Sequence, residues 1–330
     1  MEEGMMSIGD EWTAIQLIAR SQTNPQKAIA ELVENSLDAR ASRVLIERFK
    51  YKRKPALYVE DAGDGFPLNS KGIPDVEGTP KRICDSLKRK LDEAERKGIH
   101  GEFGIGLLGF WSVGDKLIVL TKASQTDTWQ LEMKAGERPY KWGRGEKQDI
   151  INGHGTVLII YPVRKEMQNR LTAEKLAKYL GEELRDRIRK SGAEVIVKDT
   201  ILKKELRVRP AEFPGEPLRE IESLHVEGYP PIKVELYWSL MKEGEVPPVA
   251  LCKDGTRVIK DILELDEFQC PPWNNRRLIG ILDFPAFKLA PTTRAGIVPD
   301  EAYKAFVAVV KAREPLLIKL LEEKEKEKEE

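Results

Sequence analysis

The sequence lacks any apolar run long enough to cross a membrane. A membrane-spanning helix needs about 20 consecutive apolar residues, and no segment approaches that length in a chain of which 33% is charged. Residues 1–10 are acidic and have no apolar core of the kind that a secretion signal carries. We therefore expect no membrane partner and a cytoplasmic location.

Cysteine and histidine are scarce, with three of each in 330 residues. Cys84, Cys252 and Cys270 do not have the spacing of metal ligands, and we expect them to be small buried or half-buried thiols. The three histidines, His100, His154 and His225, form no HExxH pair. A zinc hydrolase is therefore not indicated.

The chain also lacks an excess of charge of either sign, because 55 basic residues balance 55 acidic ones. Bulk charge thus predicts no nucleic-acid partner, although a local basic groove stays open as an alternative. Basic runs occur at residues 50–54 and 185–190. Asn and Gln are rare beside Lys, Glu and Arg, which is typical of hyperthermophile proteins and predicts a thermophilic source.

Hydrophobic periodicity predicts an α+β fold, in which helices and antiparallel strands are segregated along the chain. A helix is expected over residues 26–40, where Asn24 and Pro25 supply a cap and a first-turn proline. Alternating segments predict strands at residues 43–49, 56–60, 116–121, 128–133 and 156–161. Residues 81–97 read as a charged helix.

We place a domain boundary after residue 162. The second domain is expected over residues 163–314, and residues 315–330 form a charged helical tail that ends almost entirely in Lys and Glu. Its predicted elements are helices at 172–190 and 300–311 and strands at 195–197, 233–239, 249–251 and 278–284.

The first predicted helix carries a polar constellation in the segment ELVENSLDA. Glu31 and Asn35 are four residues apart and so share one face of the helix, with Asp38 one turn further on. A carboxylate can activate water, and an amide oxygen is a hard ligand that suits Mg²⁺. The pair could therefore serve one phosphate site.

Two glycine-rich turns follow. In DAGDGF, residues 61–66, Asp61 ends a strand and can accept from the exocyclic amine of a base, which Gly63 and Gly65 allow to come close. In GEFGIGLLGF, residues 101–110, Gly101, Gly104 and Gly106 precede an apolar helical run, where free amides can bind phosphate. No βαβ unit surrounds this turn and no GKS or GKT follows it, so Rossmann and Walker sites are not indicated.

These elements, together with Gly155-Thr156 at the start of a strand, resemble in order and spacing the signature of the Bergerat ATPases. That superfamily includes gyrase B, MutL, the heat-shock chaperones and histidine kinases. The resemblance covers about residues 24–162 and implies an ATP-binding α/β sandwich with an ATP lid at about residues 67–101. It implies ATP and Mg²⁺ as cofactors, and ATPase activity.

The resemblance assigns a role to each matching residue. Glu31 corresponds to the general base, and Asn35 to the ligand of Mg²⁺. Asp61 corresponds to the aspartate that binds adenine, supported by Thr156. The other nucleotide-binding positions that the resemblance implies are Asp38, Gly63, Gly65, Lys81, Gly101, Phe103, Gly104, Ile105 and Gly106.

The second half resembles the transducer domains of MutL, the type II topoisomerase B subunits and the MORC proteins. The segment CKDGTRVIKD, residues 252–261, is similar to a strand–turn–strand of MutL. At the family's switch lysine this sequence has Thr293 or Arg294. Arg294 is therefore the expected γ-phosphate contact, with Lys288 as its rival.

The resemblance implies an ATP-driven switch that forms a homodimer, binds ATP or ADP, and hydrolyses slowly. Three downstream roles stay open: a clamp on DNA, like MORC or MutL; a chaperone-like clamp on protein clients; and a nucleotide-regulated interaction module without turnover. GEFGIGLL stands where MutL has GFRGEAL, so authentic mismatch repair is not indicated. From the length of this sequence and from the segment before the domain, which has no phosphoacceptor-histidine helix, we expect neither a complete chaperone nor a histidine kinase.

Overall fold

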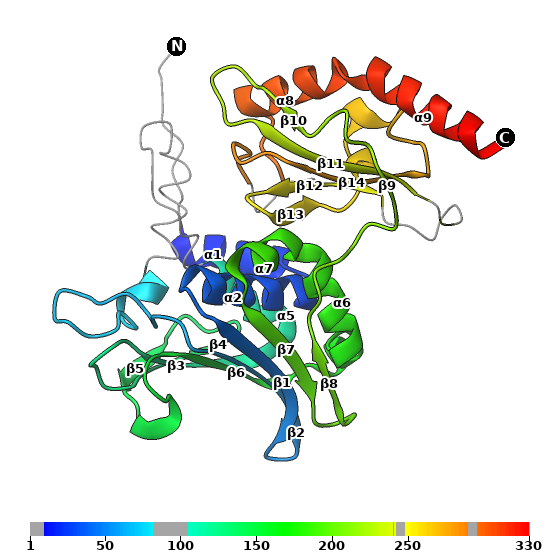
Figure 1. Ribbon diagram of the computed structural model, residues 1–330. Helices are drawn as coiled ribbons and strands as arrows, with labels where there is room; N and C mark the ends of the chain where they lie inside the picture. Colours follow the sequence, from blue (N-terminus) through cyan, green and yellow to red (C-terminus); the bar gives the residue numbers. More distant parts are fainter. Residues whose placement is uncertain (1–9, 82–104, 240, 242–247, 290–295, 330) are drawn as a thin grey trace, which may run out of the picture. The chain divides into compact units, whose positions relative to one another are not determined.

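The computed structural model describes residues 10–81, 105–239, 241, 248–289 and 296–329, which fall into two compact units. The first unit comprises Met1–Gly181 and Ile188–Pro210, and the second comprises Glu182–Arg187 and Ala211–Glu330. Each unit has its own sheet and its own helices (Figure 1). The predicted α+β class is thereby confirmed.

The first unit is built on an eight-stranded sheet in the order β5-β4-β3-β6-β2-β1-β7-β8. All neighbours are antiparallel except β1 and β7, which are parallel. The strands are β1 (Arg43–Tyr51), β2 (Lys54–Asp61), β3 (Gly114–Lys122), β4 (Trp129–Lys134), β5 (Lys141–Arg144), β6 (Gly155–Val163), β7 (Glu194–Asp199) and β8 (Lys204–Arg207).

Helices cover one face of this sheet, which we call the inner face (Figure 1). Buried side chains alternate along its central strands β1 and β2, as in Leu57, Val59 and Asp61 of β2. The helices are α1 (Glu11–Ser21), α2 (Pro25–Asp38), α4 (Ile105–Leu108), α5 (Phe110–Val113), α6 (Ala173–Glu183) and α7 (Arg185–Ser191). The 3₁₀ turns are η1 (Gln148–Ile150) and η2 (Lys165–Arg170).

Helix α2 forms where local signals predict it. The Asn24 side chain accepts a hydrogen bond from the Gln26 amide at 3.1 Å, and Pro25 occupies the first helical position. Its apolar residues, among them Ile29 and Val33, are fully buried. The helix is further tied to α6 by the Gln26 side chain, which donates to the Lys175 carbonyl at 3.1 Å.

The first unit extends past the boundary expected at residue 162. Pro162 lies near the end of β6, beyond the stretch that pairs with β2, so its missing N–H disrupts little. The chain then returns through α6 and α7 to β7, which pairs with β1 in this same sheet. The single helix expected over residues 172–190 is broken between Glu183 and Arg185.

The second unit has a six-stranded sheet in the order β10-β11-β14-β12-β13, with β9 also pairing with β11. A cluster of buried rings, Phe268, Phe284, Phe287 and Phe306, joins this sheet to its helices. The elements are β9 (Gly215–Pro217), β10 (Ser223–Leu224), β11 (Ile232–Ser239), β12 (Val249–Lys253), β13 (Thr256–Ile259), β14 (Leu278–Asp283), η3 (Ile262–Glu264), η4 (Asp266–Phe268), α8 (Glu301–Lys311) and α9 (Glu314–Glu329).

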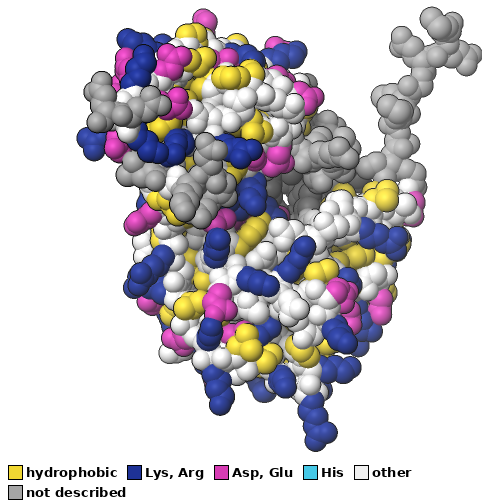
Figure 2. Space-filling model, turned by 90° about the vertical axis from the view of Figure 1, so that its right-hand side faces the viewer, with side chains coloured by type: hydrophobic (Ala, Val, Ile, Leu, Met, Phe, Trp, Pro, Cys, Tyr) yellow, Lys and Arg dark blue, Asp and Glu magenta, His cyan; other side chains and the backbone are white. Residues whose placement is uncertain are grey.

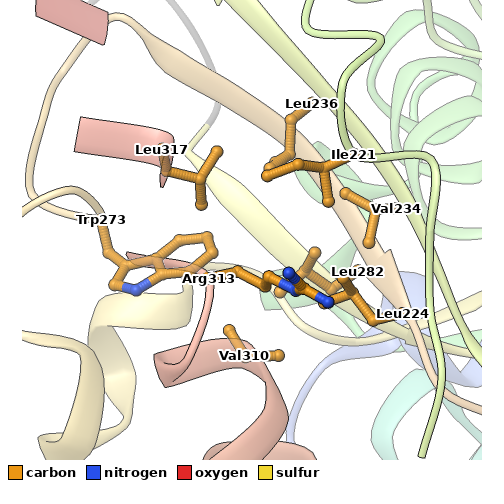
Figure 3. A pocket seen from close by; sticks show the side chains of 9 residues that line it. All are labelled: Ile221, Leu224, Val234, Leu236, Trp273, Leu282, Val310, Arg313 and Leu317. Atoms are coloured by element: carbon orange, nitrogen blue, oxygen red, sulfur yellow. The ribbon is translucent and has the colours of Figure 1, made fainter. Parts of the chain in front are cut away.

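The C-terminal tail is a helix, and its first half belongs to the core of the second unit. Leu317 and Leu321, four residues apart on α9, are both buried. A small cavity of about 10 Å³ lies beside Leu317, with Trp273, Leu282 and Arg313 among its other lining residues (Figure 3). A cavity of this size holds about one water and needs polar partners to keep it. Its mostly apolar lining therefore marks imperfect packing.

Arg185 is a buried ionic contact of Glu182–Arg187, the helical segment that belongs to the second unit. Its guanidinium donates to Glu235 at 2.8 Å, to the Ala211 carbonyl at 2.7 Å and to Asp186 at 2.8 Å. The side chain is only 5% exposed. The basic run at residues 185–190 therefore does not present its first arginine as a surface charge.

We expect Glu235 to make the second unit sensitive to acid. Burial alone would raise the pKa of Glu235, but hydrogen bonds from Arg185 and Tyr237 outweigh it and hold this pKa at about 2. Because the folded pKa lies below the ordinary value of 4.5, the stabilisation is complete above that value and is lost as the pH falls toward 2. Urea titrations of wild type and Glu235→Gln, followed by tryptophan fluorescence, should give unfolding free energies that converge on acidification. A difference in unfolding free energy between the two proteins that does not change with pH would contradict this role of Glu235.

Candidate functional site

Three polar side chains form a row on the inner face of the first sheet. Asp61 of β2 is opposite Thr156 of β6, and Thr156 is opposite Thr121 of β3. The two threonine hydroxyls are 3.3 Å apart, and Thr121 also accepts from the Phe66 amide at 2.9 Å. All three residues of the row are buried. A polar row in an otherwise apolar face indicates a site rather than packing.

The Asp61 carboxylate is held from both sides. Its Oδ2 accepts from the Ser36 hydroxyl of α2 at 2.8 Å, and its Oδ1 accepts from the Gly63 amide at 2.9 Å. Burial raises the pKa of Asp61, while these two hydrogen bonds and one from the Thr156 amide act in the opposite direction. Each carboxylate oxygen has two lone pairs, so the group keeps capacity for a further donor.

The turn that follows Asp61 packs against α2 and β3. A methyl group on Gly63 would meet the Ala39 carbonyl at 2.7 Å. Gly65 has a φ of +77°, and a methyl group there would meet the Lys122 carbonyl at 2.5 Å. Both glycines are therefore required by close backbone contacts, which fix the turn beside the polar row.

The other face of α2 meets the glycine-rich segment. A methyl group built on Gly106 would lie 3.2 Å from Oε2 of Glu31 and 3.9 Å from Nδ2 of Asn35. Glu31 and Asn35 therefore lie together beside the backbone at the start of α4. One helix thus contacts the glycine segment through these residues and the Asp61 turn through Ser36, although the three stretches are far apart in sequence.

Of the remaining predicted residues, some are exposed or form ion pairs of their own, and others lie outside the described residues. Asp38 is at the exposed C-terminal end of α2, and Lys81 pairs with Glu77 at 2.8 Å. Lys288 pairs with Asp300 at 3.1 Å. Ile105 begins α4, but its side chain is not described. Outside the described residues lie Gly101, Phe103, Gly104 and Arg294, together with residues 82–101 of the predicted lid.

Three residues of the site were not predicted from the sequence. Ser36 and Thr121 hold Asp61 and the turn, and the ring of His154 lies with Nδ1 2.6 Å from the Gly63 carbonyl. Ser36 directly follows Asn35 in the motif and could have been noticed there. Thr121 and His154 give no local signal, because their roles depend on strand register.

The arrangement offers a buried acceptor at Asp61, a tight glycine turn, and an acid–amide pair beside the backbone of Gly106. Oxygen ligands from one amide or carboxylate, with the others from a phosphate group, suit Mg²⁺. Asn35 supplies such an amide and Glu31 stands next to it, so the donor set fits this ion. In the described part of the chain no three His, Cys, Asp or Glu side chains gather into a metal cluster.

Comparison with protein families agrees with this geometry. Residues 23–142 match the family of histidine kinase-, DNA gyrase B- and HSP90-like ATPases. The first unit contains a Bergerat ATPase domain. The matched segment includes α2, the Asp61 turn and Gly106, and a domain of this family implies nucleotide binding.

Two kinds of curated relative share part of this chain. The DNA mismatch repair protein MutL of Shewanella pealeana is 34% identical over 117 residues, which cover 36% of this chain and 18% of MutL. The chaperone protein HtpG of Actinobacillus pleuropneumoniae is 28% identical over 191 residues, which cover 51% of this chain and 29% of HtpG. The matches therefore span less than a third of either relative.

No helix in the described residues combines the length and apolar character that a membrane crossing requires.

Proposed function

We propose that this protein is a Mg²⁺-dependent ATPase that uses ATP binding to close and dimerise as a clamp on DNA. The observation that carries the proposal is the meeting of three distant segments: Glu31 and Asn35 beside Gly106, and Ser36 on Asp61. A single purine triphosphate would connect them, with its base at Asp61 and its phosphates near Gly106.

In this proposal each residue has a distinct task. The Asp61 carboxylate accepts a hydrogen bond from the adenine amine. Thr156 and Thr121, in the same polar row, line the base site. The Gly106 amide lies at the start of α4, where it can donate to phosphate. Glu31 orients a water and takes its proton as the water attacks the γ-phosphorus. Asn35 would hold Mg²⁺, which neutralises phosphate charge.

The second unit serves in this proposal as a transducer-like domain that responds to the γ-phosphate. Arg294 is the proposed contact, with Lys288 as the alternative. Lys288 already pairs with Asp300, so its use would require that this exposed ion pair opens. Exposed pairs of this kind contribute about 1 kcal/mol or less, and opening is therefore feasible.

The closing step is tested by the size of the particle. We expect the full chain to be monomeric with ADP and Mg²⁺ and dimeric with a non-hydrolysable ATP analogue, because γ-phosphate contacts favour the closed state. Light scattering after gel filtration measures the mass directly. An unchanged mass with the analogue would remove the dimerising switch while leaving nucleotide binding intact.

A second candidate is a clamp on protein clients. It is favoured by the match to HtpG, which covers more of this chain than the MutL match does. A client clamp should bind unfolded polypeptide with little dependence on salt, whereas a DNA clamp should weaken steeply as salt increases. A third alternative, a nucleotide-regulated module without turnover, predicts ATP binding and no phosphate release.

A further inference from the structure

The tip of the β1–β2 hairpin concentrates positive charge in a protein with no net charge. Lys50, Lys52, Arg53 and Lys54 are all exposed, and the sequence contains no acidic residue between Glu47 and Glu60. The hairpin projects from the end of the first sheet, and Figure 2 shows Lys and Arg side chains spread over the lower part of that unit.

Two cations on neighbouring strands of the same sheet are neutralised, but those of the hairpin tip are not. Lys116 pairs with Glu132 at 2.5 Å and Lys198 pairs with Glu47 at 3.6 Å. Within the described parts of the chain, none of the four cations at the tip has an ion-pair partner. Their charge is therefore available to a ligand.

The two central residues of the turn are cations, although the backbone conformation there favours Asn and Gly. Tyr51 pairs with Lys54, so the loop has two residues, Lys52 and Arg53, with φ of 47° and 64°. Turns with positive φ at both central positions strongly prefer Asn-Gly or Gly-Gly. A strained conformation held by two charged residues is a feature that clusters at functional positions.

Aromatic contacts hold the hairpin in place. The rings of Tyr51 and Tyr161 meet edge to face with centroids 5.1 Å apart, and Phe49 and Tyr58 do so at 6.4 Å. Tyr51 is nevertheless 43% exposed, so its hydroxyl adds a hydrogen-bond donor to the basic tip. The charges are thus presented on a braced strand pair rather than on a loose loop.

A second turn adds to the same end of the sheet. The Thr200 amide donates to the Arg48 carbonyl at 2.9 Å, which places the β7–β8 turn beside β1. Lys203 in this turn is exposed and also has a positive φ, of 55°. Lys203 therefore adds one further cation, on the turn of the adjacent strand pair.

From these observations we infer that the β1–β2 hairpin tip contacts the sugar–phosphate backbone of double-stranded DNA. The backbone carries one negative charge per about 1.7 Å of duplex, which dense, unpaired cations match. Lys, Arg and Tyr are donors to phosphate oxygens. The turn residues Lys52 and Arg53 offer no apolar wedge for insertion into a lipid surface, and contacts to phosphate oxygens position a protein on the duplex without reading its sequence.

The contact lies far from the proposed nucleotide site. Lys54 begins β2 and Asp61 ends it, a separation of about 23 Å by the rise of a strand. The inference rests on the DNA-clamp part of the proposed function, but it does not depend on ATP turnover. The two can therefore fail separately.

The test replaces Lys52 with Asn and Arg53 with Gly in the full chain. This double variant removes two charges and supplies the preferred turn sequence, so we expect unfolding midpoints equal to or above wild type. Binding of a short labelled DNA duplex should weaken at least tenfold at about 0.1 M salt. The slope of log affinity against log salt should fall in magnitude by about 2.

A matched control, Lys141→Asn with Lys147→Gln, removes the same charge from the β5 edge of the sheet and should leave DNA affinity nearly unchanged. Equal losses in the two variants would overturn the inference, because they would indicate net charge alone. Binding to phosphatidylserine vesicles without binding to DNA would also overturn it. If wild type binds DNA without hydrolysing ATP, and the double variant loses that binding, the ATPase proposal is wrong and the hairpin contact is supported.

Discussion

Replacing Glu31 with glutamine is expected to lower ATP turnover by about 10²- to 10⁴-fold, the usual contribution of a positioned general base. The amide has the same shape as the carboxylate but cannot take the proton of the attacking water. Nucleotide affinity should change little, because base and phosphate contacts come from other residues. Phosphate release under saturating ATP and binding of a fluorescent ATP analogue measure the two effects separately.

Glu34→Gln is a suitable control, since it makes the same chemical change on the same helix. Of these two glutamates, Glu31 is the one that lies against Gly106, with Oε2 at 3.2 Å from a methyl group built there. We expect Glu34→Gln to retain turnover within a few-fold of wild type. Full turnover in Glu31→Gln would transfer the base role to another group, while equal losses in both variants would indicate a general effect on α2.

The structure agrees best with the sequence where local signals are strong. The Asn24 cap, Pro25 and the apolar spacing of α2 all depend on neighbouring residues, and the helix begins one residue from the predicted position. Positions that are four apart on a helix share a face, so the joint placement of Glu31 and Asn35 could be read directly. The glycines of the Asp61 turn were also informative, because only glycine fits such close contacts.

Tertiary pairing limits what the sequence can reveal. The boundary expected after residue 162 does not take account of β7, which pairs with β1, a strand more than a hundred residues earlier in the chain. Strands β5 and β8 are too short for a clear alternation. The burial of Leu317 and Leu321 could not be predicted from the charged tail, because it depends on packing in the core of the second unit.

The same limit applies inside the site. Asp61 could be predicted from its turn, but its support by Ser36 follows from the position of α2 over β2. Thr121 acquires a role only because β3 and β6 pair with Thr121 opposite Thr156. Motifs thus identify the groups that face a ligand, whereas the groups that hold them require the register of the sheet.

The second large effect is expected from Asp61→Asn, which should weaken ATP binding by about 10- to 100-fold. A hydrogen bond to a charged acceptor contributes about 1.5–3 kcal/mol, and each 1.4 kcal/mol is tenfold in affinity. The fold should tolerate the change. The amide oxygen can still accept from the Gly63 amide, and Ser36 can direct its hydroxyl to the Leu32 carbonyl, which lies 3.1 Å away.

Selectivity for the base separates a direct contact from a structural effect. The carboxylate attracts the adenine amine and repels the guanine carbonyl, whereas an asparagine amide can donate to guanine. Asp61→Asn should therefore narrow the ratio of ATP to GTP affinity as well as lower the affinity for ATP. Glu60→Gln, which changes the adjacent carboxylate that accepts from the Tyr58 hydroxyl at 3.0 Å, should keep the wild-type ratio.

Acidity provides an independent readout of the same carboxylate. Because burial raises the pKa of Asp61 above its usual range, this group becomes protonated at a higher pH than an ordinary aspartate and then presents a donor to the adenine amine. Wild-type affinity should therefore fall on acidification more steeply than that of Asp61→Asn, in which position 61 does not titrate. Titration of the nucleotide itself affects both proteins equally. Parallel pH profiles and an unchanged ATP-to-GTP ratio would together show that Asp61 does not contact the base.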